Sequence, residues 1–242
     1  MDDDRRTGAV LTIRFVAETG STNADLLTAA AAGAPEGDWL RAGRQVAGRG
    51  RMGRTWIDGG GNLFASTIVR LRPDDPPAQT LALVAPLALF DVVDALLPGR
   101  ARIKWPNDLL IGPAKLSGIL LERGAGNAVV VGFGVNLAEH PDLAERPTTA
   151  LIDHGILLTP RDAAERLRDR FAQRLDQWRR GGLDTIRTDW LAAAQPLGTP
   201  VRVRLPDGSE RAGVFDGIEP DGTMRLREPG GTIVIVHAGD VL

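Results

Sequence analysis

The sequence predicts an α+β fold in two parts: a large domain over residues 1–195 and a small antiparallel β-barrel over residues 196–242. The strand-like segments between residues 103 and 137 follow one another through short turns, which indicates a meander and not alternating β-α-β units. After residue 195, repeated turn triplets of the Pro-Asp-Gly and Pro-Gly-Gly type separate short β-rich segments, which is typical of a small barrel.

The first hundred residues are predicted to contain two helices and three strands. An alanine-rich segment that ends at Gly33 is predicted as a helix, with Ser21 or Thr22 as its N-cap. A second, apolar helix is predicted over residues 79–97, and Pro86 within it predicts either a kink or a start near residue 86. The strands expected around these helices cover residues 10–17, 39–42 and 62–71.

The rest of the chain is predicted as a meander, an irregular stretch, a helical stretch and the barrel. Residues 138–160 show no regular pattern. A charge-rich amphipathic helix is predicted over residues 161–180, ending at Gly181-Gly182, and a shorter helix follows through Trp190 to Ala194. The strands expected in the meander cover residues 109–111, 115–122 and 128–137, and those of the barrel cover 201–205, 211–218, 223–227 and 232–237.

Composition excludes several kinds of protein. The 242 residues include no cysteine, which excludes disulfides, thiolate metal sites and cysteine nucleophiles. The three histidines, His140, His154 and His237, are too far apart in the sequence to suggest a metal cluster. A net charge of −2 disfavours bulk binding to nucleic acid or to a membrane surface. With no apolar leader and no run of membrane-spanning length, a cytoplasmic protein is expected.

Residues 48–56 combine three glycines with three arginines and end at Trp56. Glycine lets backbone N–H groups approach a ligand closely, and the arginine fork suits phosphate and carboxylate. The pattern therefore predicts a loop that binds a compact polyanion, with a solvated basic loop as the alternative. The glycines formally match G-x-G-x-x-G, but a strand and not a helix is expected next, so a dinucleotide-binding fold is rejected.

Three later segments also gather groups that could bind a ligand. Residues 104–108 bring a cation, an aromatic ring, an amide and a carboxylate into one turn, unless they form only a strand end with an Asx turn. Lys115 begins a partly buried strand, either as a point charge on a carboxylate or phosphate or as a snorkelling surface residue. Gly118 and the glycines of residues 132–136 could let a ligand lie against the backbone.

Together these segments resemble the biotin–protein ligases, also called biotin–[acetyl-CoA-carboxylase] ligases. The resemblance is to the monofunctional type, which lacks a DNA-binding domain. It covers about residues 10–195, and the C-terminal barrel resembles the family's SH3-like module. The implied fold is a class II aminoacyl-tRNA synthetase/biotin synthetase-like catalytic domain with a mixed sheet and flanking helices. The matching motifs, in the family's order, are Glu18-Thr-x-Ser-Thr-Asn23, Gln45 with Gly48-Arg-Gly-Arg-Met-Gly-Arg-x-Trp56, Lys104-Trp-Pro-Asn-Asp108, Lys115-Leu-Ser-Gly-Ile-Leu-x-Glu122 and Gly132-Phe-Gly-Val-Asn136.

The resemblance implies a two-step reaction with ATP and biotin as substrates and Mg²⁺ bound. The biotin carboxylate attacks the α-phosphate of ATP and gives biotinyl-5′-AMP and pyrophosphate. A lysine amine of the biotin carboxyl carrier protein or domain of an acyl-CoA carboxylase then attacks the mixed anhydride. Because two anions must meet, such a site needs dense positive charge and precise positioning.

The resemblance also implies roles for individual residues. Trp56 is expected either to pack on adenine or to belong to the core, and Asp108 either to orient or deprotonate the incoming amine or to cap its own turn. Asn136 is the expected contact to the metal. The implied catalytic residues are Lys115, Arg51 and Asp108; the biotin-binding residues are Ser21, Thr22, Asn23, Gln45, Arg49, Gly50, Arg51, Lys115 and Gly118; the nucleotide-binding residues are Arg51, Arg54, Trp56, Asn107, Lys115 and Asn136.

Further expectations concern dynamics and partners. We expect the loop of residues 44–56 to be mobile without ligand, because its glycines cost entropy to order and its arginines repel one another. Too few residues precede the first predicted strand for a helix-turn-helix domain, so ligase activity without DNA binding is expected, with no membrane partner and a monomer or weak homodimer. The alternatives are a lipoate or octanoate ligase and a non-enzymatic RNA or phosphopeptide binder.

Overall fold

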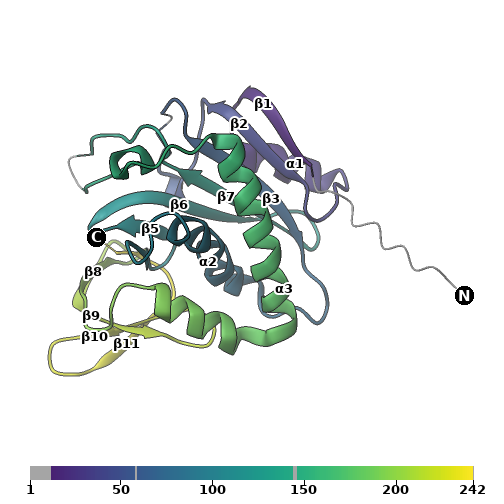
Figure 1. Ribbon diagram of the computed structural model, residues 1–242. Coiled ribbons are helices and arrows are strands. Elements are labelled where there is room, and N and C mark those ends of the chain that lie inside the picture. Colours follow the sequence, from purple (N-terminus) through teal and green to yellow (C-terminus); the bar gives the residue numbers. More distant parts are fainter. Residues whose placement is uncertain (1–11, 58, 144–145, 242) are drawn as a thin grey trace, which may run out of the picture.

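The computed structural model, which describes residues 12–57, 59–143 and 146–241, contains a seven-stranded mixed sheet in the order β1-β2-β3-β7-β6-β5-β4 (Figure 1). Only β1 and β2 run parallel, and every other neighbouring pair in this sheet is antiparallel. The strands are β1 (Ile13–Thr19), β2 (Trp39–Gln45), β3 (Leu63–Arg70), β4 (Ala101–Lys104), β5 (Asp108–Ile111), β6 (Ala114–Arg123) and β7 (Ala128–Val135). The predicted meander is confirmed as β5 to β7, and β4 adds a further strand at its start.

Helices cover both faces of this sheet. Helices α2 (Leu81–Asp94) and α3 (Pro160–Ala193) pack on one face and on each other, and α1 (Thr22–Ala31) packs on the opposite face against β2, β3 and β7 (Figure 1). Successive side chains of a strand point to opposite faces, so each central strand contributes to both layers. In β7, Val131 and Phe133 belong to the large core under α2 and α3, while Val130 belongs to the small core under α1.

The parallel pair at the edge of the sheet is a feature that the sequence pattern did not predict. Strand β1, helix α1 and strand β2 form a β-α-β unit, with Ile13 opposite Trp39 and Thr19 opposite Gln45. The predicted start of the first strand at residue 10 lies outside the described residues. Ser21 is the N-cap residue of α1, as predicted, but its side chain makes no capping hydrogen bond.

Helix α2 differs from the predicted boundaries. A short 3₁₀ turn, Ala78–Thr80, leads into a helix that begins at Leu81, continues through Pro86 and ends at Asp94. A start near residue 86 is therefore wrong. Most of α2 is buried between the sheet and α3, and such packing can hold a helix that lacks one internal hydrogen bond.

Helix α3 follows the prediction more closely. The Thr159 hydroxyl caps its start by accepting from the Asp162 backbone N–H. Gly182 has a φ of 72°, so the helical stretch is broken there into a longer and a shorter helix, as the Gly181-Gly182 pair predicted. A 3₁₀ turn at Leu151–His154 is the one helical turn within the predicted irregular stretch, as far as the structure describes that stretch. None of the described helices is long and apolar enough to cross a membrane.

The C-terminal strands form a separate antiparallel sheet in the order β11-β10-β9-β8-β12. Four of them match the predicted segments, and the two-residue strand β12 was not predicted. This sheet packs on the large part of the protein: the Trp105 indole N–H donates to the Gly222 carbonyl, 3.0 Å away. The strands are β8 (Pro200–Arg204), β9 (Glu210–Ile218), β10 (Met224–Arg227), β11 (Ile233–Val236) and β12 (Asp240–Val241).

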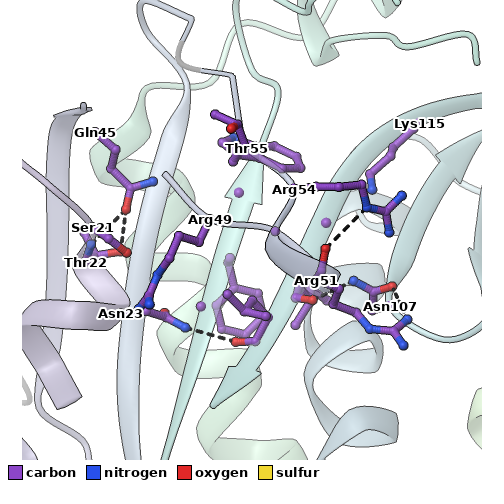
Figure 2. Close-up of a pocket in the computed structure, with 18 of the residues that line it drawn as sticks. Ser21, Thr22, Asn23, Gln45, Arg49, Arg51, Arg54, Thr55, Asn107 and Lys115 are labelled. Atoms are coloured by element: carbon purple, nitrogen blue, oxygen red, sulfur yellow. Dashed lines mark hydrogen bonds between the residues drawn. The ribbon is translucent and has the colours of Figure 1, made fainter. Parts of the chain in front are cut away.

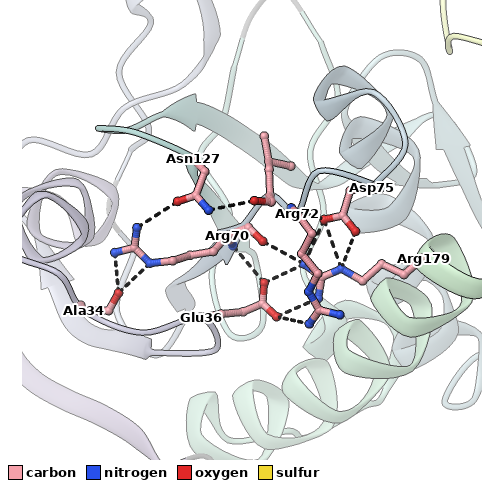
Figure 3. A network of polar contacts seen from close by, with 8 residues as sticks. Ala34, Glu36, Arg70, Arg72, Asp75, Asn127 and Arg179 are labelled. Carbon is pink, nitrogen blue, oxygen red and sulfur yellow. Dashed lines mark hydrogen bonds and ion pairs between the residues drawn. The ribbon is translucent and has the colours of Figure 1, made fainter.

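A buried ion network ties α3 to the turn before β2 and to the loop after β3 (Figure 3). The Arg179 guanidinium donates to both carboxylate oxygens of Glu36 at 2.7 Å and to Asp75 at 3.0 Å, and it also reaches the Arg70 carbonyl. The Arg179 and Asp75 side chains are 10% and 5% exposed, so this pair is largely removed from water. The network therefore joins three segments that are far apart in the sequence.

Replacing Arg179 by alanine is expected to lower the free energy of unfolding by about 3–5 kcal/mol, because two carboxylates would lose their shared buried partner. Urea unfolding measures this change. The neighbouring variant Arg180→Ala is the control: it breaks only an exposed pair with Asp176 and should cost less than about 1 kcal/mol. Equal losses in both variants would contradict the structural role of Arg179.

The same network predicts a pH dependence of stability. Burial raises the pKa of Glu36, but hydrogen bonds from Arg179 and the Arg70 backbone outweigh it, so the pKa is lowered overall. A lowered folded-state pKa gives stability that is present above the unfolded value, about 4.3, and is lost as the pH falls through the folded value. The stability difference between wild type and Arg179→Ala should therefore shrink below about pH 4.

Candidate active site

A strip of bare backbone crosses the face of the sheet that carries α1. Gly132 and Gly134 of β7 lie on this face, because they alternate with the buried residues Val131 and Phe133. Gly118 of β6 pairs directly with Gly134 and continues the strip onto the next strand. Three glycines without side chains therefore leave room above the sheet for a flat group.

One end of the strip is a buried polar cluster at the start of α1. The Gln45 side-chain oxygen accepts from the Thr22 backbone N–H at 2.8 Å and from its hydroxyl at 3.0 Å. Asn23 accepts from the Ser66 hydroxyl and donates to Glu122, at 2.6 and 2.8 Å. A Cβ atom at Gly132 would collide with the Asn23 amide, so glycine is needed where Asn23 crosses β7.

The loop of residues 46–56 folds back over this strip as a small hairpin. The Gly50 N–H donates to the Arg54 carbonyl at 2.7 Å, and the Trp56 N–H donates to the Gly48 carbonyl at 2.9 Å. Met52 at its tip has a φ of 55°, a left-handed conformation that costs energy for a residue other than glycine. The arginines of the hairpin have different partners, and Arg49 pairs with Glu122. Arg51 instead donates to Asn107, as Figure 2 shows.

Trp56 covers the glycine strip. Ideal Cβ atoms built on Gly118 and Gly134 would lie 2.8 and 2.5 Å from its indole ring, so the ring rests directly on bare backbone. Its Nε1–H is buried without a hydrogen-bond partner, and its ring lies 5.7 Å from the Lys115 ammonium. The indole thus occupies a slot in which its own N–H is unsatisfied, which favours its displacement by a ligand.

Lys115 lies where the slot meets a second cavity. Its ammonium donates to Asp108 at 2.5 Å, and Arg146 lies 3.7 Å from the other carboxylate oxygen of Asp108. Burial lowers the pKa of Lys115, and the charge of Asp108 opposes this effect. The Asp108 carboxylate is thus engaged by cations, and the alternative in which it caps its own turn is not the arrangement observed.

The chain has only two lysines, Lys104 and Lys115. Its other permanently charged cations are arginines. Both lysines line the second cavity. Burial also lowers the pKa of Lys104, partly offset by Asp108. A compact ammonium is a point charge, whereas a guanidinium is a wide planar fork. The cavity therefore combines two point charges with the forks of Arg54 and Arg146.

The two cavities adjoin each other, and the residues that line both are Arg54, Thr55, Trp56, Asn107, Lys115 and Arg146. The slot under the loop has a volume of about 60 Å³ because Trp56 fills it, whereas the second cavity measures about 550 Å³. All the site residues predicted from the sequence line one of them. Those that line the slot are Ser21, Thr22, Asn23, Gln45, Arg49, Gly50, Arg51, Arg54, Trp56, Asn107, Lys115 and Gly118, and those that line only the second cavity are Asp108 and Asn136.

Several residues that line the cavities were not predicted from the sequence. Arg146 and Thr148 belong to the stretch without a regular pattern, and Asp240 belongs to the C-terminal sheet. Nothing in their local sequence indicates that they approach the loop. Lys104 could have been selected, because it begins the same five-residue motif as Asn107 and Asp108.

The two parts of the chain match protein-family models. Residues 19–136 match the biotin/lipoate A/B protein ligase family, and residues 197–242 match the biotin protein ligase C-terminal domain. The fold and the site therefore define a ligase of the biotin and lipoate class.

Sequence relatives distinguish between the biotin and the lipoate members of this class. The chain is 40% identical over 237 residues to the biotin–[acetyl-CoA-carboxylase] ligase of Mycobacterium tuberculosis, covering 94% of this chain and 87% of the relative. It is 41% identical over 236 residues to the enzyme of that name from Paracoccus denitrificans, covering 93% and 98%. The chain belongs to the biotin–[acetyl-CoA-carboxylase] ligase family.

Solved structures agree on the fold. The biotin protein ligase from Aquifex aeolicus, solved in complex with biotin and ATP, superposes with a TM-score of 0.83 at 23% identity, covering 96% of this chain and 97% of that one. The biotin protein ligase from Leishmania major, in complex with biotinyl-5-AMP, gives a TM-score of 0.67 at 24% identity, covering 94% and 99%.

Proposed function

We propose that this chain is an ATP-dependent biotin–protein ligase that forms biotinyl-5′-AMP and transfers biotin to a lysine of a biotin carboxyl carrier domain. The observation that carries the proposal is the position of Lys115 at the junction of two cavities. The slot offers glycine backbone without side chains and a polar end for a bicyclic ring. The second cavity offers cations for a triphosphate, and the junction is where a carboxylate and the α-phosphate would meet.

The first step needs charge neutralisation and positioning. A biotin carboxylate oxygen attacks the α-phosphorus, the P–O bond to the β-phosphate breaks, and pyrophosphate leaves with the bonding pair. Lys115 faces the point where two anions approach, and its ammonium can offset their repulsion. Arg51 and Arg54 add planar donors from the loop above. Thr22, Asn23 and Gln45 supply amide and hydroxyl groups for the ureido end of the ring.

The second step needs an unprotonated amine. The acceptor lysine attacks the acyl carbon of the mixed anhydride, forms an amide and expels AMP. Asp108 lies beside Lys115 in the second cavity. We propose that it orients the incoming amine once the substrate anions compete for Lys115. Trp56 lines both cavities and can move from the slot to pack on adenine when biotin displaces it.

The donor groups fit a Mg²⁺ ion that binds together with the triphosphate. No group of three or more histidine, aspartate or glutamate side chains that could hold a metal ion exists among the described residues. Asn136 lines the second cavity and offers an amide oxygen, a hard ligand of the kind that Mg²⁺ accepts beside phosphate oxygens and water. Bound there, the ion would neutralise phosphate charge.

We also propose the following biological setting. The partner is a biotin carboxyl carrier protein or domain of an acyl-CoA carboxylase, with no DNA or membrane partner. The enzyme works in the cytoplasm, where ATP is available, as a monomer or weak homodimer. Residues 1–195 form the catalytic domain and residues 196–242 the SH3-like module. The family models that end at residue 136 and begin at residue 197, and a first C-terminal strand at Pro200, support this division.

Exchange of labelled pyrophosphate into ATP tests the proposed activity. Wild-type protein with Mg²⁺ should catalyse exchange only when biotin is present. Lipoate and octanoate, offered at the same concentration, distinguish the related ligase activities. Exchange that depends on lipoate and not on biotin would replace the proposed substrate. Salt-sensitive RNA binding without any exchange would favour a non-enzymatic binder.

Biotin binding is also expected to change the dynamics of the loop. The slot of about 60 Å³ is far smaller than the roughly 300 Å³ of ordinary ligand pockets, so biotin must displace Trp56 and reorganise residues 44–56. Amide hydrogen exchange in these residues should therefore become at least about tenfold slower when biotin is bound, and ATP affinity should rise with it. Equal exchange with and without biotin would contradict this coupling.

A further inference from the structure

The last strand of the C-terminal sheet contacts the arginine loop. The Arg54 Nη2 atom lies 2.6 Å from Asp240 Oδ1, and Arg51 Nη1 lies 4.0 Å from the same oxygen. Arg51 Nη2 also donates to the Gly239 carbonyl, at 3.3 Å. Two arginines that are three residues apart in the loop are therefore both held by Gly239 and Asp240 at the start of β12, almost two hundred residues further along the chain.

This arrangement explains how the two guanidinium groups can lie together in the ligand-free structure. Burial lowers the pKa of Arg51 and the nearby Arg54 lowers it further, while the carboxylates of Asp240 and Asp108 raise it. The Asp240 side chain is 17% exposed and lines the second cavity. Asp240 thus supplies a negative charge at the place where the loop would otherwise need a bound anion.

The same carboxylate also competes with a nucleotide. Guanidinium groups bind carboxylates and phosphates with the same planar fork of donors. Arg54 and Asp240 line the cavity that we assign to the triphosphate, so a phosphate that approaches Arg54 also approaches Asp240. Like charges at such distances repel strongly in a partly buried site. For a phosphate to be bound by Arg54, the contact between Arg54 and Asp240 must weaken or break.

We propose that Asp240 is an internal counter-anion that holds Arg51 and Arg54 in the ligand-free enzyme and releases them to the phosphates of ATP. This inference rests on the proposed function for the identity of the nucleotide. It makes the C-terminal sheet part of the nucleotide site, with Asp240 as a positioning residue. The loop is kept folded before ATP binds, and ATP binds less tightly than it would without the competing carboxylate.

The variant Asp240→Asn tests both parts of the proposal, because asparagine keeps the shape and removes the charge. In the ligand-free protein, amide hydrogen exchange at residues 49–56 should become about tenfold faster, since the ion pair is lost. Calorimetric titration with ATP and Mg²⁺ should give a dissociation constant about 3- to 10-fold lower, because a competing negative charge is gone. The affinity for biotin should change less than that for ATP.

Two further variants control this test. Asp207→Asn removes the same charge from an exposed turn of the same sheet, where the side chain bonds only Ser209 among the contacts found, and it should behave as wild type. Asp240→Glu keeps the charge and should restore slow hydrogen exchange and the wild-type affinity for ATP, even if Asp240→Asn folds poorly.

Each outcome decides the question. Identical behaviour of Asp240→Asn and Asp207→Asn would overturn the proposal. Weaker ATP binding by Asp240→Asn would also overturn it, since Asp240 would then support the phosphate site and not compete for it. Neither measurement requires catalysis. If biotin-dependent pyrophosphate exchange were absent, the proposed function would be wrong. Amide hydrogen exchange at residues 49–56 of the ligand-free protein would still test the ion pair between Arg54 and Asp240.

Discussion

Replacing Lys115 by alanine is expected to lower the rate of biotin-dependent pyrophosphate exchange by about 10³-fold or more. Lys115 lines both cavities, as Arg54 and Arg146 also do, and it is 8% exposed, so its charge acts where it is largely shielded from water. Single groups that stabilise developing charge in such sites are worth about 10²–10³ in rate, and Lys115 would also reduce the repulsion between two ground-state anions. Exchange of labelled pyrophosphate measures the effect directly.

Loss of folding must be separated from loss of catalysis in this variant. Removing Lys115 leaves the Asp108 carboxylate without its 2.5 Å partner, which is expected to destabilise the fold by about 3–5 kcal/mol. The variant Lys115→Arg keeps a charge beside Asp108 but replaces a point charge by a wide fork. It should remain folded in urea titrations and still lose about 10² in exchange rate.

Near-normal exchange by Lys115→Arg would show that any cation suffices at this position. Near-normal exchange by folded Lys115→Ala would remove Lys115 from the mechanism altogether. In that case Lys104, the other lysine that lines the second cavity, would be the next candidate.

The predictable parts of this fold are those encoded in short stretches of sequence. The strands of the meander alternate and are separated by turn residues, so β5, β6 and β7 were predicted within a few residues. The break in α3 was predicted because Gly181-Gly182 interrupts an amphipathic pattern. The site residues were selected from motifs that each occupy one loop or one strand end, and the fold brings these motifs to two adjoining cavities.

The parts that were missed depend on contacts between distant segments. The parallel pairing of β1 with β2 is determined by how α1 crosses over, which no local pattern reports. Helix α2 continues through Pro86 because it is packed between the sheet and α3. Asp240 contacts Arg54 only because the C-terminal sheet docks beside the loop. Each of these features follows from tertiary packing and not from a residue's own neighbours in sequence.

The dynamics of the loop of residues 44–56 depend on charges both within it and outside it. Its glycines and its mutually repelling arginines predict mobility when no anion is bound. The structure contains a counter-charge, Asp240, that the sequence argument did not include. This ion pair opposes the repulsion between the arginines, so the predicted mobility of the loop must be tested by the hydrogen-exchange measurements described above.

Gly134→Val is expected to raise the Michaelis constant for biotin by about 100-fold while leaving that for ATP nearly unchanged. The ideal Cβ at this position would lie 2.5 Å from the Trp56 ring, in the slot that we assign to the biotin rings. A ligand that replaces Trp56 would meet the valine methyl groups. A steric mismatch of about one carbon in a tight pocket lowers the specificity constant by about 10- to 200-fold. Gly134 has an ordinary strand conformation, and valine favours strands, so the backbone should tolerate the change, while the Trp56 ring must move aside to make room for the new side chain.

Gly60→Val is the matched control for this variant. A Cβ atom at Gly60 would find its nearest neighbour 3.9 Å away, in an exposed turn, and the backbone there is not left-handed. This variant should retain wild-type constants for both substrates in the pyrophosphate-exchange assay. If Gly134→Val kept its affinity for biotin, the ring system could not lie on the glycine strip. If it lost affinity for ATP instead, the substitution would act through Trp56, which also lines the second cavity, and not through a clash with the biotin rings.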